Sequence, residues 1–120
     1  VVLARRYTPG REGKSSVPME GVAQAALAAL EDLQGALLER ALEFRRSHTA
    51  RPSDYEGLRA AVAEGFAHAW WCGSEECEAR VKEETKATIR CIPLEQPDGE
   101  GECVVCGQPA AEEAVFARAY

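Results

Sequence analysis

The sequence lacks the motifs of the common catalytic and nucleotide-binding sites. It contains no HExxH metalloprotease motif, no nucleophile elbow, no P-loop and no GxGxxG stretch. Aromatic residues make up only 7% of the chain, and none is interleaved with a basic run. The chain therefore has no platform for stacking single-stranded bases. Taken by itself, this segment is predicted to be neither a catalyst nor a nucleotide-binding domain.

Long hydrophobic runs are also missing, so no membrane-spanning helix is expected. The chain opens Val-Val-Leu-Ala-Arg-Arg, without an initiator Met, a basic leader region or a cleavage site. These absences exclude a signal peptide and predict no membrane contact, and the cysteine pattern described below favours a cytoplasmic protein. They also predict that the segment was cut from a longer polypeptide that ends at or close to Tyr120.

Basic charge is scarce, because 14 Lys and Arg face 20 Asp and Glu, for a net charge of −6. An acidic chain is a poor general nucleic-acid binder, since affinity for phosphate comes from positive charge. The only basic patch is the turn-rich loop at residues 8–16, which reads TPGREGKSS. Two interpretations of this loop stay open, namely a solvated connector and a phosphate or RNA contact.

Cysteine, in contrast, is present in a specific pattern. Cys72 and Cys77 form one pair, and Cys103 and Cys106 form a second pair directly before Gly107. Two such pairs around an insert are typical of a four-thiolate structural zinc site. The total of five cysteines is odd, which favours a reducing compartment and zinc over a disulfide framework. The four paired cysteines are therefore the predicted ligands of a structural Zn²⁺.

The remaining chemistry leaves three alternatives open. The alternation of Ala87, Ile89 and Cys91 in a predicted strand indicates that Cys91 is a small buried hydrophobe, with ligand or catalytic duty as the alternative. His68, four residues before Cys72, is expected to be a packed strand residue, although it would be the ligand in a three-cysteine site. Cys103 and Cys106 would alternatively form a redox dithiol, but that motif belongs at a helix N-terminus.

Hydrophobic periodicity places the secondary structure. Residues 1–7 are predicted to be a buried strand, and residues 19–46 a helix of about 28 residues that packs on it and links two bodies. A capping box at residues 53–56, with Ser53 as N-cap, opens a helix that ends near residue 65. Ser74 is predicted to cap a helix over 75–86, which puts Cys77 in its first turn and favours its thiolate. The predicted strands of this part are residues 67–71, 85–92 and 114–120.

These elements predict an α+β fold: a small two-layer mixed sheet with helices on one face and a structural zinc site. A long helix from the neighbouring domain precedes it. The expected domains are residues 1–48, the end of one domain plus a linker, and residues 49–120, the zinc-binding domain. A unit of roughly 70 residues has little core, so zinc would contribute on the order of 10 kcal/mol to its folding.

Several stretches together resemble a known family. The opening VVLARR resembles the last strand of the anticodon-binding domain of class II prolyl-tRNA synthetases, and VPMEG resembles the helix entry after that strand. WCGSEECE at 71–78, RCIP at 90–93 and CVVCGQPA at 103–110 resemble the zinc-binding C-terminal domain of the archaeal- and eukaryote-type branch. The closing FARAY resembles the terminal tyrosine of that branch, and the composition fits a thermophilic bacterial source.

The resemblance implies a function for the parent protein. Its members attach L-proline to tRNA(Pro) in two ATP-dependent steps via prolyl-adenylate, as homodimers, with ATP and Mg²⁺ bound in a catalytic domain outside this segment. It implies that Cys72, Cys77, Cys103 and Cys106 hold the zinc, and that the carboxylate of Tyr120 lies near the active site. The implied partners are the catalytic and anticodon-binding domains of the same protein. The alternatives are a freestanding zinc-stabilised module that binds nucleic acid or protein, and a thiol redox protein.

Overall fold

A computed structural model describes residues 1–119 of the chain. The chain divides into two compact units, unit 1 at Val1–Arg45 and unit 2 at Arg46–Tyr120. Within residues 1–119, no helix combines the length and apolar character that crossing a bilayer requires.

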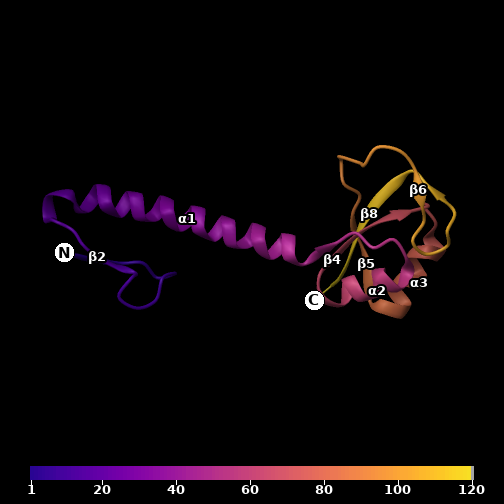
Figure 1. Cartoon of the computed structure of the whole chain (residues 1–120), viewed down its shortest axis with the longest axis horizontal. Helices are drawn as coiled ribbons and strands as arrows, with labels where there is room; N and C mark the ends of the chain where they lie inside the picture. Colours follow the sequence, from indigo (N-terminus) through magenta and orange to yellow (C-terminus); the bar gives the residue numbers. More distant parts are fainter. Residues whose placement is uncertain (120) are drawn as a thin grey trace. The chain divides into compact units, whose positions relative to one another are not determined.

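Unit 1 consists of a small hairpin and most of a long helix (Figure 1). Strands β1 (Val2–Ala4) and β2 (Lys14–Ser16) pair antiparallel, with Val2 opposite Ser16. The prediction of a buried strand over residues 1–7 is wrong, because Val2 is 61% exposed and β1 has only three residues. The chain turns directly after β1, where the Arg5 amide donates to the Gly13 carbonyl at 2.6 Å.

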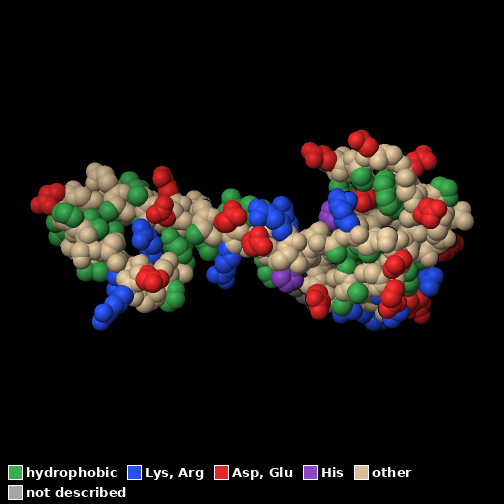
Figure 2. Space-filling model, viewed as in Figure 1, with side chains coloured by type: hydrophobic (Ala, Val, Ile, Leu, Met, Phe, Trp, Pro, Cys, Tyr) green, Lys and Arg blue, Asp and Glu red, His purple; other side chains and the backbone are tan. Residues whose placement is uncertain are grey.

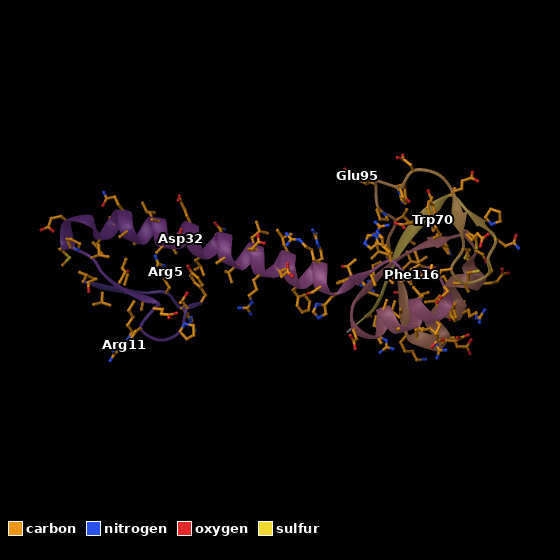
Figure 3. All side chains as sticks on the ribbon, viewed as in Figure 1. Arg5, Arg11, Asp32, Trp70, Glu95 and Phe116 are labelled. Atoms are coloured by element: carbon orange, nitrogen blue, oxygen red, sulfur yellow. The ribbon has the colours of Figure 1, made fainter. Side chains whose placement is uncertain are left out.

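The predicted long helix is confirmed. A short 3-10 turn, η1 (Met19–Gly21), leads into α1 (Val22–Ser47). Leu30 and Leu33 of α1 line a hollow with Leu3 of β1, and Arg5 forms an ion pair with Asp32 at 3.6 Å (Figure 3). The helix has no buried residue, and five of its larger apolar side chains are half-exposed or more: Leu27, Leu30, Leu37, Leu38 and Phe44.

Unit 2 has the predicted α+β architecture, with a mixed sheet and helices on one face (Figure 1). The four-stranded sheet has the order β3-β4-β8-β5, in which β3 is parallel to β4, and β8 is antiparallel to β4 and β5. A separate small ladder joins β6 to β7. The elements are β3 (Thr49–Ala50), α2 (Tyr55–Glu64), β4 (Phe66–Trp71), α3 (Glu75–Thr85), β5 (Ala87–Cys91), β6 (Gly101–Glu102), β7 (Pro109–Ala110) and β8 (Glu112–Arg118).

The core of unit 2 lies between the sheet and helices α2 and α3. Its four largest fully buried side chains are Leu58 and Val62 of α2, Val81 of α3 and Phe116 of β8. The strands contribute mainly alanines to this face: Ala67, Ala69, Ala87 and Ala114. Small strand residues let the helices approach the sheet, and Phe116 fills much of the space between them.

Several element boundaries in unit 2 differ from prediction, and β5, for example, covers Ala87–Cys91 instead of residues 85–92. Asp54, and not Ser53, caps α2, because its carboxylate accepts the Gly57 amide at 2.7 Å. Strand β8 begins at Glu112 instead of 114, and ends at Arg118 instead of 120. Strand β3, which lies before α2, was not predicted, because two residues are too few to show a periodic pattern.

A glycine forms the junction between α2 and β4. A Cβ at Gly65 would lie 2.1 Å from the carbonyl oxygen of His48, the same oxygen that accepts the Phe66 amide at 2.8 Å. We expect Gly65→Ala to destabilise unit 2 by about 1–3 kcal/mol, because the β3 backbone must move away from β4. Thermal unfolding measures this change.

The matched control for Gly65→Ala is Gly35→Ala in α1. A Cβ at Gly35 meets nothing within 4 Å, so this change should raise helix stability by about 0.5–1 kcal/mol. Equal unfolding midpoints for wild type and Gly65→Ala would contradict the steric argument.

Candidate metal centre

The first cysteine pair lies at the junction of β4 and α3. Cys72 follows β4 directly, and Gly73, at φ +81°, turns the chain toward the helix. Ser74 caps α3 as predicted, since its hydroxyl accepts the Glu76 amide at 3.2 Å. Cys77 consequently lies in the first turn of α3. The indole of Trp71 donates to the Ser74 carbonyl at 3.2 Å and thereby holds the loop in place.

The second pair lies in the turn between β6 and β7. The Cys103 amide donates to the Gln108 carbonyl, and the Gly107 amide donates to the Cys103 carbonyl, both at 2.8 Å. Gly107 has φ +74°, a left-handed conformation that glycine adopts without steric cost. These bonds close a tight loop that turns both cysteine side chains to one side.

Strand β4 also links the second knuckle to the first. The Trp70 carbonyl accepts the Val104 amide at 3.0 Å. Gly101 lies so close to the Trp70 indole that a Cβ there would be 2.4 Å from the ring. Figure 3 shows Trp70 beside this part of the sheet. The two tryptophans before Cys72 therefore position both knuckles, a role that their adjacency to Cys72 could have suggested.

The two knuckles bring four sulfur atoms together. The Sγ atoms of Cys72, Cys77, Cys103 and Cys106 all lie within 4.8 Å of one another, and none of them forms a disulfide. Cys72 Sγ is 3.7 Å from both Cys77 Sγ and Cys106 Sγ. A tetrahedral ion with zinc–sulfur bonds of about 2.3 Å separates its sulfurs by roughly 3.8 Å. The donor set and its spacing thus fit one Zn²⁺.

Burial divides the four cysteines. Cys77 and Cys103 are 8% and 3% exposed, Cys72 is half-buried, and Cys106 is exposed. Burial, followed by the neighbouring thiols of Cys106 and Cys72, raises the pKa of Cys77 to about 12. A bound zinc ion would oppose this rise, so the Cys77 thiolate stays a prediction for the zinc-bound site.

Cys103 behaves in the opposite way. Burial acts to raise the pKa of its thiol, but the backbone amides of Cys106 and Val105 outweigh burial and lower the pKa to about 7. Amide donors aimed at a sulfur stabilise its anion. These amides favour the thiolate of Cys103, which is the form that binds zinc.

The fifth cysteine lies away from this cluster, and its predicted burial is wrong. Cys91 is exposed, because a β-bulge shifts the register between Ile89 and Cys91. Ile89 lies opposite Phe116, whereas Cys91 lies opposite Val115, one residue along β8 instead of two. The extra residue in the bulge breaks the two-residue alternation, which the sequence pattern had assumed to continue.

His68 is likewise placed apart from the sulfurs. Its Nδ1 atom is buried and lies 3.8 Å from an oxygen of Glu113, whose carboxylate accepts hydrogen bonds from Arg51 through both oxygens. The Gln96 side chain pairs with the Glu113 backbone, accepting its amide at 2.7 Å and donating to its carbonyl at 3.2 Å. The last residue of β5 pairs with Val115 of β8. The Gln96 side chain thus bonds to the β8 backbone at Glu113, beyond the point where β5 ends.

We expect His68 to make unit 2 less stable at mildly acidic pH. Burial, followed by the Arg51 charge, lowers the pKa of His68, although Glu113 opposes the shift. The ordinary pKa of histidine is about 6.5. As the pH falls below this value, His68 binds a proton in the unfolded chain, whereas in the folded chain it does so only at lower pH. Stability should therefore fall as the pH decreases from about 6.5.

The measurement is the free energy of unfolding against pH for wild type and His68→Gln. The variant should show a shallower decline in this range than wild type does. Parallel curves for His68→Gln and wild type would refute the assignment.

Comparisons with known proteins agree on one family. A family model described as "Prolyl-tRNA synthetase, C-terminal" matches residues 55–120. The chain is 52% identical over 120 residues to a proline–tRNA ligase of Roseiflexus castenholzii and 49% identical to one of Chloroflexus aurantiacus. Each match covers 100% of this chain and 25% of the relative. The chain thus spans about a quarter of the length of these curated relatives.

A solved structure of Cryptosporidium parvum prolyl-tRNA synthetase, complexed with L-proline and AMP, has the same fold. It superposes with a TM-score of 0.79 at 24% sequence identity, covering 89% of this chain and 24% of that one. At this identity the likeness concerns the fold alone.

Proposed function

The chain belongs to the prolyl-tRNA synthetase C-terminal family, and we propose that its parent protein attaches L-proline to tRNA(Pro) in two ATP-dependent steps via prolyl-adenylate. The observation that carries this proposal is the 52% identity to a proline–tRNA ligase along the whole chain. ATP and Mg²⁺ would bind in the catalytic domain, outside this segment. The relatives in Roseiflexus and Chloroflexus fit the expected thermophilic bacterial source.

The test is proline-dependent exchange of pyrophosphate into ATP by the full-length protein that contains this chain. Exchange with proline, and proline transfer to tRNA(Pro), are the expected results. A full-length protein that binds zinc yet activates no amino acid would instead be a zinc-stabilised module that binds nucleic acid or protein.

We propose that Cys72, Cys77, Cys103 and Cys106 hold a structural Zn²⁺. The 3.7 Å sulfur contacts and the four free thiols support this assignment. A zinc ion with four thiolate ligands has no open coordination position, so it supplies a cross-link between distant segments. Here the cross-link would join the β4–α3 junction to the β6–β7 turn. Metal analysis should find about one zinc per chain.

We propose that residues 1–48 complete the anticodon-binding domain and the linker, and that residues 49–120 form the zinc-binding C-terminal domain. The exposed leucines of α1 support this, since a relative four times longer would have other segments to cover them. The proposed partners are the catalytic and anticodon-binding domains of the same protein, tRNA(Pro) and a second copy in a cytoplasmic homodimer.

Contact with tRNA is better assigned to unit 1 than to unit 2. Figure 2 shows acidic side chains gathered over the loop between β5 and β6, which contains Glu95, Asp98 and Glu100. Such a surface repels phosphate. The basic loop of unit 1, with Arg11 and Lys14, is the more suitable surface.

Tyr120 lies outside the described residues, and we propose that its carboxylate approaches the active site of the parent enzyme. The support is that strand β8 is held in the sheet up to Arg118, two residues before Tyr120 in the sequence. Deleting Tyr120 from the full-length enzyme should impair proline activation and leave zinc content unchanged. Unaltered activation kinetics would exclude the proposal.

A further inference from the structure

The four-sulfur cluster has one buried side and one side open to solvent. Cys77 and Cys103 are buried, whereas Cys106 is exposed and Cys72 is half-buried. A dissolved oxidant therefore reaches Cys106 first. The 3.7 Å separation of its Sγ from Cys72 Sγ puts a second, partly accessible sulfur next to the point of attack.

From this arrangement we infer that Cys72 and Cys106 form a peroxide-sensitive pair, in which oxidation produces a Cys72–Cys106 disulfide and releases the metal. The inference rests on the proposed zinc site for the metal release, but the pairing of the sulfurs depends only on their positions. A hydroperoxide is the chemical class of the oxidant.

The chemistry proceeds in two steps. The Cys106 thiolate attacks one peroxide oxygen, the O–O bond breaks, and hydroxide leaves, so that Cys106 becomes a sulfenic acid. The Cys72 thiolate then attacks the Cys106 sulfur and expels a second hydroxide as the S–S bond forms. Two thiolates lose two electrons, one peroxide gains them, and two protons from solvent convert the hydroxides into water.

The other pairings are less favourable. Cys77 is also 3.7 Å from Cys72, but it is buried in the first turn of α3, away from the oxidant. Cys103 is 3% exposed, and the hydrogen bonds of its knuckle hold its backbone. The exposed Cys91 lies outside the cluster, so its oxidation is expected to stop at the sulfenic acid.

The disulfide would replace one cross-link by another. It would join the end of β4 to the β6–β7 turn across 34 residues, the same two segments that the metal site connects. A covalent link across a long loop restrains the unfolded chain. Oxidation would thus remove two of the four ligands and still keep the knuckles together.

The experiment adds hydrogen peroxide to the zinc-loaded full-length protein that contains this chain. Zinc release is followed with a metallochromic dye, and disulfides are mapped by mass spectrometry without reduction. We expect about one zinc released per disulfide formed, with Cys72–Cys106 as the main linkage, and recovery after dithiol and zinc. Main linkages of Cys72 to Cys77 or of Cys103 to Cys106, or zinc retained after Cys106 is oxidised, would overturn the inference.

Two variants sharpen this test. Cys91→Ser should leave zinc release unchanged. Cys106→His keeps a zinc ligand in a three-cysteine set but removes the exposed thiol, so zinc release should slow by about tenfold or more. Release from Cys106→His at the wild-type rate would contradict the inference. A protein without zinc before peroxide would refute the metal proposal alone, because disulfide mapping on that sample still tests the pair.

Discussion

Cys103→Ser is expected to unfold unit 2 while α1 stays helical. Cys103 is 3% exposed, and a serine hydroxyl is a much weaker zinc ligand than a thiolate. Structural zinc contributes on the order of 10 kcal/mol to the folding of small domains, which is comparable to the entire stability of most of them. Among the described residues, the core of unit 2 has only four large fully buried side chains, so it has little stability to replace this loss.

The two units can be followed separately in this experiment. Both tryptophans of the chain, Trp70 and Trp71, lie in unit 2, so their fluorescence reports its unfolding. Far-UV circular dichroism should retain the contribution of α1, because none of its residues is buried in this chain. A chelator added to wild type should reproduce the effect of the substitution.

The matched control is Cys91→Ser, the same chemical change at an exposed position. It should alter the free energy of unfolding by no more than about 0.5 kcal/mol, as is usual at the surface. If Cys103→Ser had the fluorescence and thermal profile of Cys91→Ser, zinc would not be a structural element of unit 2.

Phe116→Ala is the substitution expected to destabilise the core most. Phe116 is fully buried near the middle of the central strand β8, opposite Ala67 of β4 and Ile89 of β5 (Figure 3). Its small neighbours cannot fill the space that its ring would leave. The expected loss is about 3–5 kcal/mol, measured by denaturant unfolding in buffer with excess zinc.

Phe66→Ala is the matched control for this change. Phe66 lies on the neighbouring strand β4 but is 39% exposed, so truncation should cost less than half as much. Zinc content should stay near one per chain in both variants, because neither side chain touches the sulfur cluster. Equal losses for the two phenylalanines would show that burial in this core does not determine stability.

Local signals allowed most of the helices to be predicted from sequence. The apolar stripe of α1 repeats along the helix, so its presence could be predicted although its start lies at Val22 instead of residue 19. Ser74 stands directly before an acidic first turn, so the start of α3 was also predicted. The pairing of four cysteines followed from spacing alone, since knuckles are short-range structures. The start of α2 could be predicted only to within one residue. Ser53 and Asp54 are both good N-cap residues, and in the structure Asp54 is the cap.

Features that depend on distant partners could not be predicted. The bulge that exposes Cys91 arises where β5 meets β8, twenty-four residues later, and nothing within β5 marks it. The raised pKa of Cys77 reflects burial under segments that lie far away in the sequence. The backbone-like pairing of Gln96 with Glu113 is of the same kind, because a glutamine in a loop carries no sign of its partner.

The place of β8 in the sheet has a consequence for synthesis of the protein. Strands β4 and β5 do not pair with each other; both pair with β8, which comes after them in the chain. During synthesis, β4 and β5 therefore leave the ribosome before their partner strand, and the backbone groups that pair with Glu112–Arg118 stay unpaired until β8 is made. A nascent chain that stalls or terminates before Glu112 would expose those edges to chaperones and proteases, so sheet closure distinguishes chains that contain β8 from chains that lack it.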